Sequence, residues 1–187
     1  MTYVIGIDPS SKKLALCWTQ HYGGADGNLP SMKTFKLPVG ISRASWEANR
    51  QLFLFLSREL PLGEEDIEVY LEEPLVGHNI HSTIVQAQVN GAVLAVVESF
   101  RIMGVYNALV HVSTWKKDVV GKGNAKKEDA AAWLEKNWPE AYHLAEGDQD
   151  LIDAACINRY GTQRIALKSR RLRVRKASPP AAPTKKR

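Results

Sequence analysis

The chain has 187 residues, of which 44% are hydrophobic and 24% are charged, and its formal net charge is +5. This size predicts one globular domain with a substantial core, and the longest apolar run, 92–97, falls far short of the ~18 residues typical of a membrane span. The N-terminus lacks the basic start and apolar stretch of a secretory signal, and the two cysteines, Cys17 and Cys156, lie in apolar segments, so we expect a reduced, cytoplasmic protein.

The N-terminal part is expected to form three strands, over 2–8, 14–20 and 32–37. Apolar and β-branched residues dominate each run, and turn residues separate the runs. A tight Pro-Ser-Ser turn joins the first two strands, and a Gly-rich loop joins the next two. Because no helix lies between them, the three strands favour an antiparallel meander.

Helices and strands alternate in the rest of the chain. In order, we expect a helix over 42–60, a strand over 66–73, a helix over 82–100, a strand over 108–113, a helix over 126–138 and a last helix from 150 to about 165. The faces expected to be buried are Trp46, Leu52, Phe53, Leu56 and Leu60 in the first helix, and Ile84, Ala87, Gly91, Leu94 and Ala95 in the second.

This order of elements predicts an α/β fold with a five-stranded mixed sheet and helices packed on both of its faces. Right-handed crossovers make the fourth and fifth strands parallel to their neighbours. In open sheets of this kind, functional sites gather beyond the carboxyl ends of the parallel strands. Side chains at these strand ends are therefore the first candidates for a site.

Four acids fall at the ends of the expected elements. Asp8 ends the first strand, Glu72 ends the fourth, and Asp150 and Asp153 share one face at the start of the last helix. Taken singly, each acid has a structural explanation. Asp8 suits a turn, Glu72 suits a solvated strand end beside Glu73, and the other two suit a helix cap and the helix dipole.

Together, four carboxylates at one edge of a sheet indicate a bound cation. Carboxylates that lie close together repel and raise one another's pKa values unless a cation neutralises them. Hard oxygen ligands without Cys or closely spaced His suit Mg²⁺ or Mn²⁺ and not zinc. Two such ions ~3.5–4 Å apart can activate a water and stabilise the leaving oxygen of a phosphodiester. The acids therefore favour a metal-dependent nuclease.

The same acids lie in three stretches that resemble the acidic motifs of RuvC-type Holliday junction resolvases. The stretches are "IGIDPSS" at the end of the first strand, "YLEEP" at the end of the fourth and "DLIDAAC" in the last helix, and the resemblance covers about residues 2–162. It implies a ribonuclease H-like fold and a metal-dependent endonuclease. In this family's scheme the two Mg²⁺ or Mn²⁺ ions would be held by Asp8, Glu72, Asp150 and Asp153. The short chain with a basic tail is similar to the compact members that bacteriophages encode.

A basic stretch, "TWKKDVVGKGNAKKEDA", also resembles the family's segment after the fifth strand. By this match Lys116 and Lys127 lie where the family keeps lysines near the scissile phosphate, which implies a catalytic role; a solvated loop and helix end is the alternative. Trp115, beside Lys116, is the tryptophan to test for DNA contact, whereas the other tryptophans are expected mostly in the core. The remaining lysines are candidates for contacts with the DNA backbone: Lys117, Lys122 and Lys126.

One position departs from the family's pattern, and one ligand is ambiguous. Where the bacterial enzymes stack an aromatic residue on bases at the junction centre, this chain has Leu75, which offers apolar surface and no π face. We therefore expect tolerance for forks, flaps or other branched DNA besides four-way junctions. Glu73 is an alternative ligand to Glu72, and only one of them can face Asp8, because successive side chains of a strand point to opposite faces.

The end of the chain carries most of its positive charge. Residues 164–187 contain ten basic residues and no acid, so they carry +10 while 1–163 carry −5. We assign 1–163 to a RuvC-like nuclease domain and 164–187 to a basic tail that is at least partly disordered, since Pro, Ala and Lys bury little. A basic arm suggests a polyanionic partner, most simply DNA; a solubilising tail is the alternative. The DNA-contact candidates in this tail are Arg170, Arg171, Arg173 and Arg175.

The preferred prediction is a Mg²⁺- or Mn²⁺-dependent endonuclease that cleaves branched DNA in the cytoplasm of a bacterium or a phage-infected host cell. A homodimer is expected, because a four-way junction is cut on two strands at two-fold related positions, and the helix over 82–100 is its candidate interface. Neither a membrane nor a small-molecule cofactor is expected. The alternatives are a nuclease for RNA or RNA–DNA hybrids, a non-catalytic junction-binding protein, and an actin-like phosphotransferase, which would need a second domain.

Overall fold

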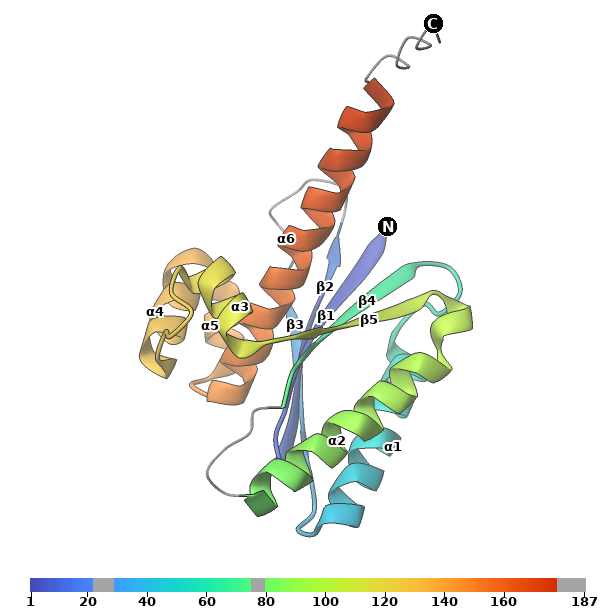
Figure 1. Ribbon diagram of the computed structural model, residues 1–187, viewed down its shortest axis with the longest axis vertical. Coiled ribbons are helices and arrows are strands. Elements are labelled where there is room, and N and C mark those ends of the chain that lie inside the picture. Colours follow the sequence, from blue (N-terminus) through green and yellow to red (C-terminus); the bar gives the residue numbers. More distant parts are fainter. Residues whose placement is uncertain (22–28, 75–79, 178–187) are drawn as a thin grey trace, which may run out of the picture.

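A computed structural model describes residues 1–21, 29–74 and 80–177, with the backbone alone at Ile41 and 170–177. Its centre is a five-stranded sheet with the strand order β3-β2-β1-β4-β5 (Figure 1). β1 pairs antiparallel with β2 and parallel with β4; β2 pairs antiparallel with β3, and β4 parallel with β5. The mixed sheet expected from the sequence is therefore confirmed. The strands are β1 (Thr2–Pro9), β2 (Lys13–His21), β3 (Ser31–Lys36), β4 (Asp66–Glu72) and β5 (Val105–Val110).

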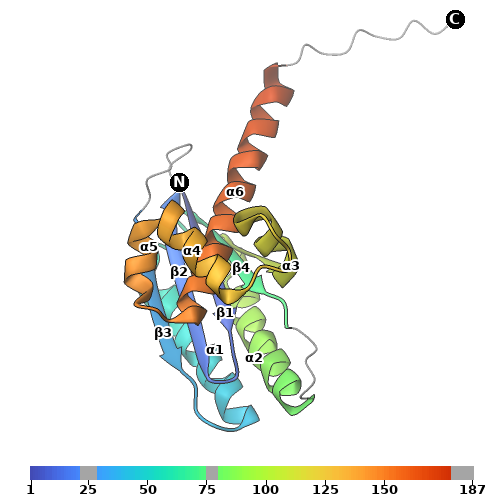
Figure 2. The same cartoon turned by 90° about the vertical axis from the view of Figure 1, so that its left-hand side faces the viewer.

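Helices cover both faces of the sheet, as Figure 1 and Figure 2 show. Alternation of side chains along β1 places Ile5 and Ile7 in the core on one face and Val4 in the core on the other. The first face carries α1 (Ile41–Glu59) and α2 (Ile80–Ser99), followed by the short turn η1 (Arg101–Met103). The second face carries α3 (Val112–Trp115), the π-helical turn η2 (Lys116–Val120), α4 (Lys127–Asn137), α5 (Pro139–Ala145) and α6 (Gln149–Ala177).

The fifth strand begins and ends earlier than the sequence indicated, at Val105–Val110 in place of 108–113. Gly104 precedes it with a φ of 82°, a left-handed conformation that glycine adopts without strain. After Val110, the side chain of His111 accepts a hydrogen bond from the amide of Ser113 and caps α3. The cap satisfies an amide at the helix start and turns the following residues into a helix.

The outer faces of α1 and α2 differ from the prediction. Trp46 and Phe53 of α1 are 64% and 47% exposed, although Leu52, Leu56 and Leu60 are buried as expected. In α2 the valine side contacts the core, and the exposed side chains include Ile84, Ala87, Gly91 and Ala95. Because α2 is apolar all round, its periodicity does not distinguish the two faces. By length and composition it could also cross a membrane, a test that core helices of soluble proteins pass as well.

α6 approaches β1 closely at Gly6. A Cβ atom there would lie 2.2 Å from the carbonyl oxygen of Ala154 and 2.3 Å from the backbone nitrogen of Asn158, so this approach requires glycine. The buried side chain of Asn158 donates hydrogen bonds to the carbonyl oxygens of Val4 at 2.7 Å and Cys17 at 3.2 Å. These contacts fix the distance between α6 and the sheet, and with it the position of the first turns of α6.

α6 is also longer than predicted, because it continues to Ala177 and does not end near Ile165. Residues 165–177 contain no Gly or Pro and are rich in Ala, Leu, Arg and Lys, which all have high helix propensity. The boundary placed at 163/164 therefore lies inside one continuous helix. Figure 1 shows this part of α6 projecting beyond the sheet. The disorder expected at the very end of the chain concerns residues outside the described ones.

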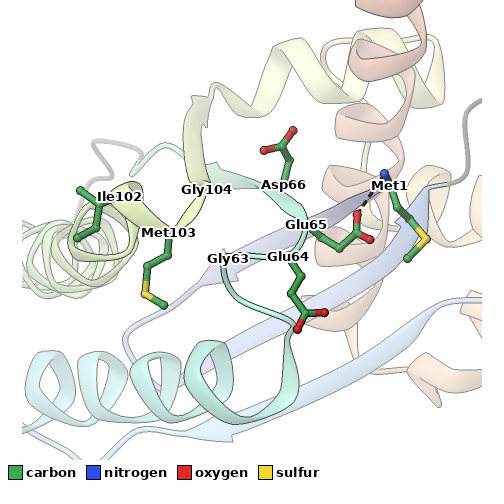
Figure 3. Close-up of a pocket in the computed structure, with 8 residues that line it drawn as sticks. All are labelled: Met1, Gly63, Glu64, Glu65, Asp66, Ile102, Met103 and Gly104. Atoms are coloured by element: carbon green, nitrogen blue, oxygen red, sulfur yellow. Dashed lines mark ion pairs between the residues drawn. The ribbon is translucent and has the colours of Figure 1, made fainter.

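Two open hollows lie away from the carboxyl ends of β1 and β4, one at the amino ends of these strands and one over β4 and β5. One of about 330 Å³ is lined by Met1, Glu64, Glu65 and Asp66 among others, and the amino group of Met1 pairs with Glu65 at 3.1 Å (Figure 3). The other, of about 340 Å³, lies over β4 and β5 and reaches Lys168 of α6. Neither hollow is lined by the acids that the sequence singled out.

Candidate active site

Asp8 and Glu72 lie side by side at one edge of the sheet because their strands are parallel neighbours. Ile7 of β1 is paired with Leu71 of β4, so the two acids follow at the same level. α6 begins at Gln149 over the same edge of the sheet (Figure 1). Its first two turns carry Asp150 and Asp153 and bring them to the ends of the strands.

Burial and mutual repulsion raise the pKa values of three of these acids, Asp8, Glu72 and Asp153. Asp8 is only 9% exposed, and burial raises the pKa of its carboxyl well above the usual range. Glu72, Asp153 and Asp150 each raise this pKa further by their negative charge. Burial raises the pKa of Glu72 to about 7 and also raises the pKa of Asp153. The four acids therefore form one electrostatic group, which we call the acid cluster.

Two members of the acid cluster, Glu72 and Asp153, each accept a hydrogen bond from a neighbouring side chain at one carboxylate oxygen. The indole Nε1 of Trp115 donates a hydrogen bond of 2.7 Å to Oε2 of Glu72. The side-chain amide of Gln149 donates a hydrogen bond of 2.9 Å to Oδ1 of Asp153. Both donors stabilise the ionised carboxylates and partly offset the effect of burial on their pKa values.

Lys13 holds the start of α6. Its Nζ pairs with Oδ1 of Asp148 at 2.8 Å and with Oδ2 of Asp150 at 3.0 Å. Asp148 accepts a hydrogen bond from the amide of Asp150 and thereby caps α6, a role that the sequence offered to Asp150 itself. Lys13 is placed by the turn after Asp8, in which the hydroxyl of Ser10 accepts from the Lys13 amide. The β1–β2 turn is thus tied to the first turn of α6.

Two lysines face the acid cluster. Lys116, in η2, is half-buried, and its Nζ donates to the carbonyl oxygen of Ala125 at 2.8 Å. Its charge partly offsets the rise that burial causes in the pKa of Glu72. The charge of Lys127, the first residue of α4, likewise partly offsets the rise in the pKa of Asp8. A π-helical turn is a rare element that is frequent at functional sites, and here it carries the more buried of the two lysines.

The chemistry of the acid cluster fits a divalent metal ion. Its carboxylates repel one another, and such an ion would supply the positive charge that Lys13, Lys116 and Lys127 provide only in part. Within the ranges that the structure describes, no three Asp, Glu, His or Cys side chains already form a ready-made metal site. The residues that would hold the ion are Asp8, Glu72, Asp150 and Asp153, three of which have one oxygen engaged by a protein donor.

Of the two adjacent acids at the end of β4, Glu72 faces Asp8. The backbone amide of Glu73 continues the sheet by donating to the carbonyl oxygen of Val110 at 3.0 Å. The side chain of Glu73 is absent from the charges that act on Asp8. Glu72 is therefore the glutamate whose charge acts on Asp8.

The other candidate residues are placed as follows. Trp115, named from the sequence as the tryptophan to test for DNA contact, is fully buried in the core on the α6 face of the sheet. Leu75 and the side chains of Arg170, Arg171, Arg173 and Arg175 lie outside the described residues. The side chains of Lys117, Lys122 and Lys126 are exposed.

Sequence reasoning missed three partners of the acid cluster: Trp115 as a donor to Glu72, Gln149 as a donor to Asp153 and Lys13 as the partner of Asp150. Lys13 directly follows the turn after Asp8. A basic residue this close in sequence to a candidate metal ligand could have indicated its role. Trp115 gave a weaker signal, since a tryptophan beside a lysine also suits a surface that binds nucleic acid. Only its burial distinguishes the two roles.

No protein-family model and no curated protein sequence matches this chain. Solved structures do match it. RuvC of Thermus thermophilus is 21% identical over 86% of this chain and 97% of its own, with a TM-score of 0.58. The same protein in complex with a Holliday junction substrate is 20% identical over 90% of this chain and 98% of its own, with a TM-score of 0.65.

A more distant match is the yeast mitochondrial Holliday junction resolvase Ydc2. It is 13% identical over 90% of this chain and 83% of its own, with a TM-score of 0.53. These likenesses show that the chain has the ribonuclease H-like fold of the RuvC-type resolvases, as its three acidic motifs indicated.

Proposed function

We propose that this protein is an endonuclease that uses Mg²⁺ or Mn²⁺ to cleave branched DNA. The observation that carries the proposal is the acid cluster, in which Asp8, Glu72, Asp150 and Asp153 meet at the carboxyl edge of β1 and β4. The fold is shared with RuvC, which has been seen in complex with a Holliday junction substrate. A cluster of carboxylates beside lysines is a composition suited to metal-dependent phosphodiester hydrolysis.

In the proposed reaction the acid cluster would hold two divalent ions, which activate a water and stabilise the leaving oxygen when bound. Lys116 and Lys127 place positive charge beside the acids and would stabilise the extra negative charge on the phosphate as it is attacked. Cleavage is expected to leave a 5′-phosphate and a 3′-hydroxyl. The exposed lysines of η2 and of the loop before α4 would hold the DNA backbone by charge.

We further propose a homodimer through the exposed face of α2. This face includes Ile80, Ile84, Ala87, Gly91 and Ala95, and among the described residues nothing outside the α2 backbone lies within 4 Å of a Cβ built at Gly91. A small, apolar helix face lets two copies approach closely, and burying it would account for the apolar outer side of α2. Two copies related by a two-fold axis would present two active sites to the two strands of a junction.

The experiment is cleavage of an end-labelled four-way junction by the purified protein, with Mg²⁺, Mn²⁺ or EDTA. We expect metal-dependent cuts at symmetric positions of opposite strands, and the Asp153→Asn variant should bind the junction without cutting it. No cleavage by the wild-type protein with either metal, or full activity of both Asp8→Asn and Asp153→Asn, would refute the proposal.

The choice of substrate is tested in the same assay. Forks, flaps and linear duplex of matched sequence measure selectivity, and we expect branched DNA to be cut faster than linear duplex. Matched RNA and RNA–DNA hybrid substrates test the second candidate, which the shared fold suggests, since the ribonuclease H-like fold also serves nucleases of RNA. Faster cleavage of the hybrid than of the junction would favour that candidate.

A further inference from the structure

The feature that the proposed reaction leaves unexplained is Trp115, which contacts both kinds of charged residue in the site. The indole Nε1 donates a 2.7 Å hydrogen bond to Oε2 of Glu72. The ammonium group of Lys116 lies 5.4 Å from the centre of the Trp115 ring, a cation–π distance. The side chain of Trp115 is completely buried. One rigid ring thus joins an acid of the cluster to the neighbouring lysine.

The surroundings of Trp115 hold this ring in place. β5 pairs with β4 so that Val110 lies opposite Glu72, and α3 starts directly afterwards with His111 as its cap. Trp115 ends α3 and packs in the core with α6. The indole N–H therefore meets the carboxylate from a fixed direction, and no described residue donates to the other carboxylate oxygen of Glu72.

We propose that Trp115 is a positioning residue: its N–H orients the carboxylate of Glu72 for a divalent ion, and its ring face holds Lys116 toward the same site. This inference rests on the proposed function and adds a residue to its machinery. A donor that fixes one oxygen of a ligating carboxylate leaves the other directed at the metal. The loss of such a partner generally reduces metal affinity or activity by ~10–100-fold.

Trp115→Phe is the informative substitution, because phenylalanine keeps an aromatic ring in the core and removes only the N–H donor and part of the ring. Trp133, half-buried at the edge of the same core, supplies the matched control Trp133→Phe. The readout is the dissociation constant for Mn²⁺ without DNA, measured by calorimetry. We expect Trp115→Phe to weaken Mn²⁺ binding by ~10-fold or more and Trp133→Phe to leave it unchanged.

A double-variant cycle separates positioning from general loosening of the core. In the Glu72→Gln background, where the carboxylate is absent, adding Trp115→Phe should weaken Mn²⁺ binding no further. Junction binding in EDTA should be the same for the wild-type and Trp115→Phe proteins, whereas kcat should fall more than KM changes. An equal loss of Mn²⁺ affinity with and without the Glu72 carboxylate would overturn the inference in favour of a structural role.

A measurement on the wild-type protein covers the case in which Trp115→Phe does not fold. In protein labelled with ¹⁵N at tryptophan, the indole N–H resonance of Trp115 should shift as Mg²⁺ is added, while that of Trp133 should not. An unmoved Trp115 resonance in a protein that binds Mg²⁺ and cleaves DNA would refute this inference and leave the proposed function standing. Absence of both Mg²⁺ binding and cleavage would instead reject the proposed function.

Discussion

Asp8 shows how a single residue can favour function over stability. Its carboxyl is buried, and burial together with the negative charges of Glu72, Asp153 and Asp150 raises its pKa. In EDTA at pH 8, the Asp8→Asn variant should therefore be more stable than the wild type, by about 0.5–2 kcal/mol in the free energy of unfolding. Urea denaturation measures this difference. With Mg²⁺ the wild type should gain stability and the variant should not; a variant less stable in EDTA would contradict the argument.

Glu72, the last residue of β4, and Glu73, which follows it, form a matched pair of variants that tests which glutamate belongs to the acid cluster. Glu72 acts on Asp8 and accepts from Trp115, whereas Glu73 takes no part in these contacts. Glu72→Gln should reduce the rate of junction cleavage by at least ~100-fold, and Glu73→Gln should change it less than ~3-fold. Single-turnover kinetics at saturating protein make the comparison. Equal losses for both variants would show that strand alternation does not decide which glutamate acts.

The position of a candidate site residue could be predicted from the sequence where an acidic motif coincides with the end of a strand. Asp8 and Glu72 end apolar strands, so their neighbourhood follows from parallel pairing alone. The hydrogen bond from Trp115 could not be predicted, because it depends on where α3 begins, and His111 starts that helix inside the stretch expected as strand. A short cap of this kind is local chemistry that the pattern of apolar residues does not report.

At the scale of elements, the contact of α6 with the sheet decides whether the acids of different segments meet. Asn158 donates to the carbonyl oxygens of Val4 and Cys17 and accepts from the hydroxyl of Thr19 at 3.2 Å, all in the buried core. Asn158→Ala should lower the free energy of unfolding by about 2–4 kcal/mol, since it removes these bonds and leaves a cavity.

The control for this contact is Thr19→Val, which removes only the hydroxyl partner of Asn158. It should lower the free energy of unfolding by about 1 kcal/mol, and the double variant should lose less than the sum of the two single losses. Urea denaturation of the four proteins gives the cycle. Strict additivity would show that the bond between the two side chains contributes nothing to the docking of α6.

The outer face of α2 makes a second prediction at this scale. Gly91→Glu places a charge on the proposed dimer face, where no described residue outside α2 lies within 4 Å of the added Cβ, so it should convert a dimer into a folded monomer. Ser57→Glu, on the exposed side of α1, is the control and should remain dimeric. Sedimentation measures the mass of each protein. A wild-type protein that is monomeric at micromolar concentration, or a dimeric Gly91→Glu variant, would rule out this interface.

Element order and sheet topology were predictable because helices and strands alternate with clear turn residues, and crossover handedness then fixes the pairing. Helix faces were harder. α2 is apolar on every side, and the choice of its valines for the core depends on the fit of β-branched side chains against the sheet. The end of α6 was misjudged for a related reason, since a run of Arg, Leu, Ala and Lys describes both a basic tail and a stable helix.

At the scale of the whole molecule, the two ends of α6 carry opposite charge: negative at its start and positive at its end. Its start carries two acids of the cluster, Asp150 and Asp153, and its end carries the arginines of the basic region. The rise of an α-helix places Lys168 about 22 Å from Asp153, which corresponds to roughly six base pairs of duplex. The hollow at Met1 and Asp66 is lined by acids and would repel phosphates (Figure 3). Bound DNA is therefore expected along the α6 face of the sheet.

The last prediction follows from the distance along α6 between the acids that would cleave the DNA and the arginines that would bind it. Replacing Arg170, Arg171, Arg173 and Arg175 together by Gln should weaken junction binding and reduce the slope of log K against log salt by up to about 3.6, because each phosphate contact contributes about 0.9. The rate of cleavage at saturating protein should stay within ~3-fold of the wild type, since these positions lie more than ~20 Å along α6 from the acids.

The matched control uses two exposed arginines of α1 on the opposite face of the sheet, Arg43 and Arg58. Their replacement by Gln removes positive charge without touching the α6 face, so the salt slope should change by less than ~0.5 if binding follows local contacts. Fluorescence anisotropy between 50 and 300 mM salt gives both slopes. If the α6 and α1 variants lose the same slope per arginine replaced, net charge alone governs binding and the extension of α6 does not hold the DNA.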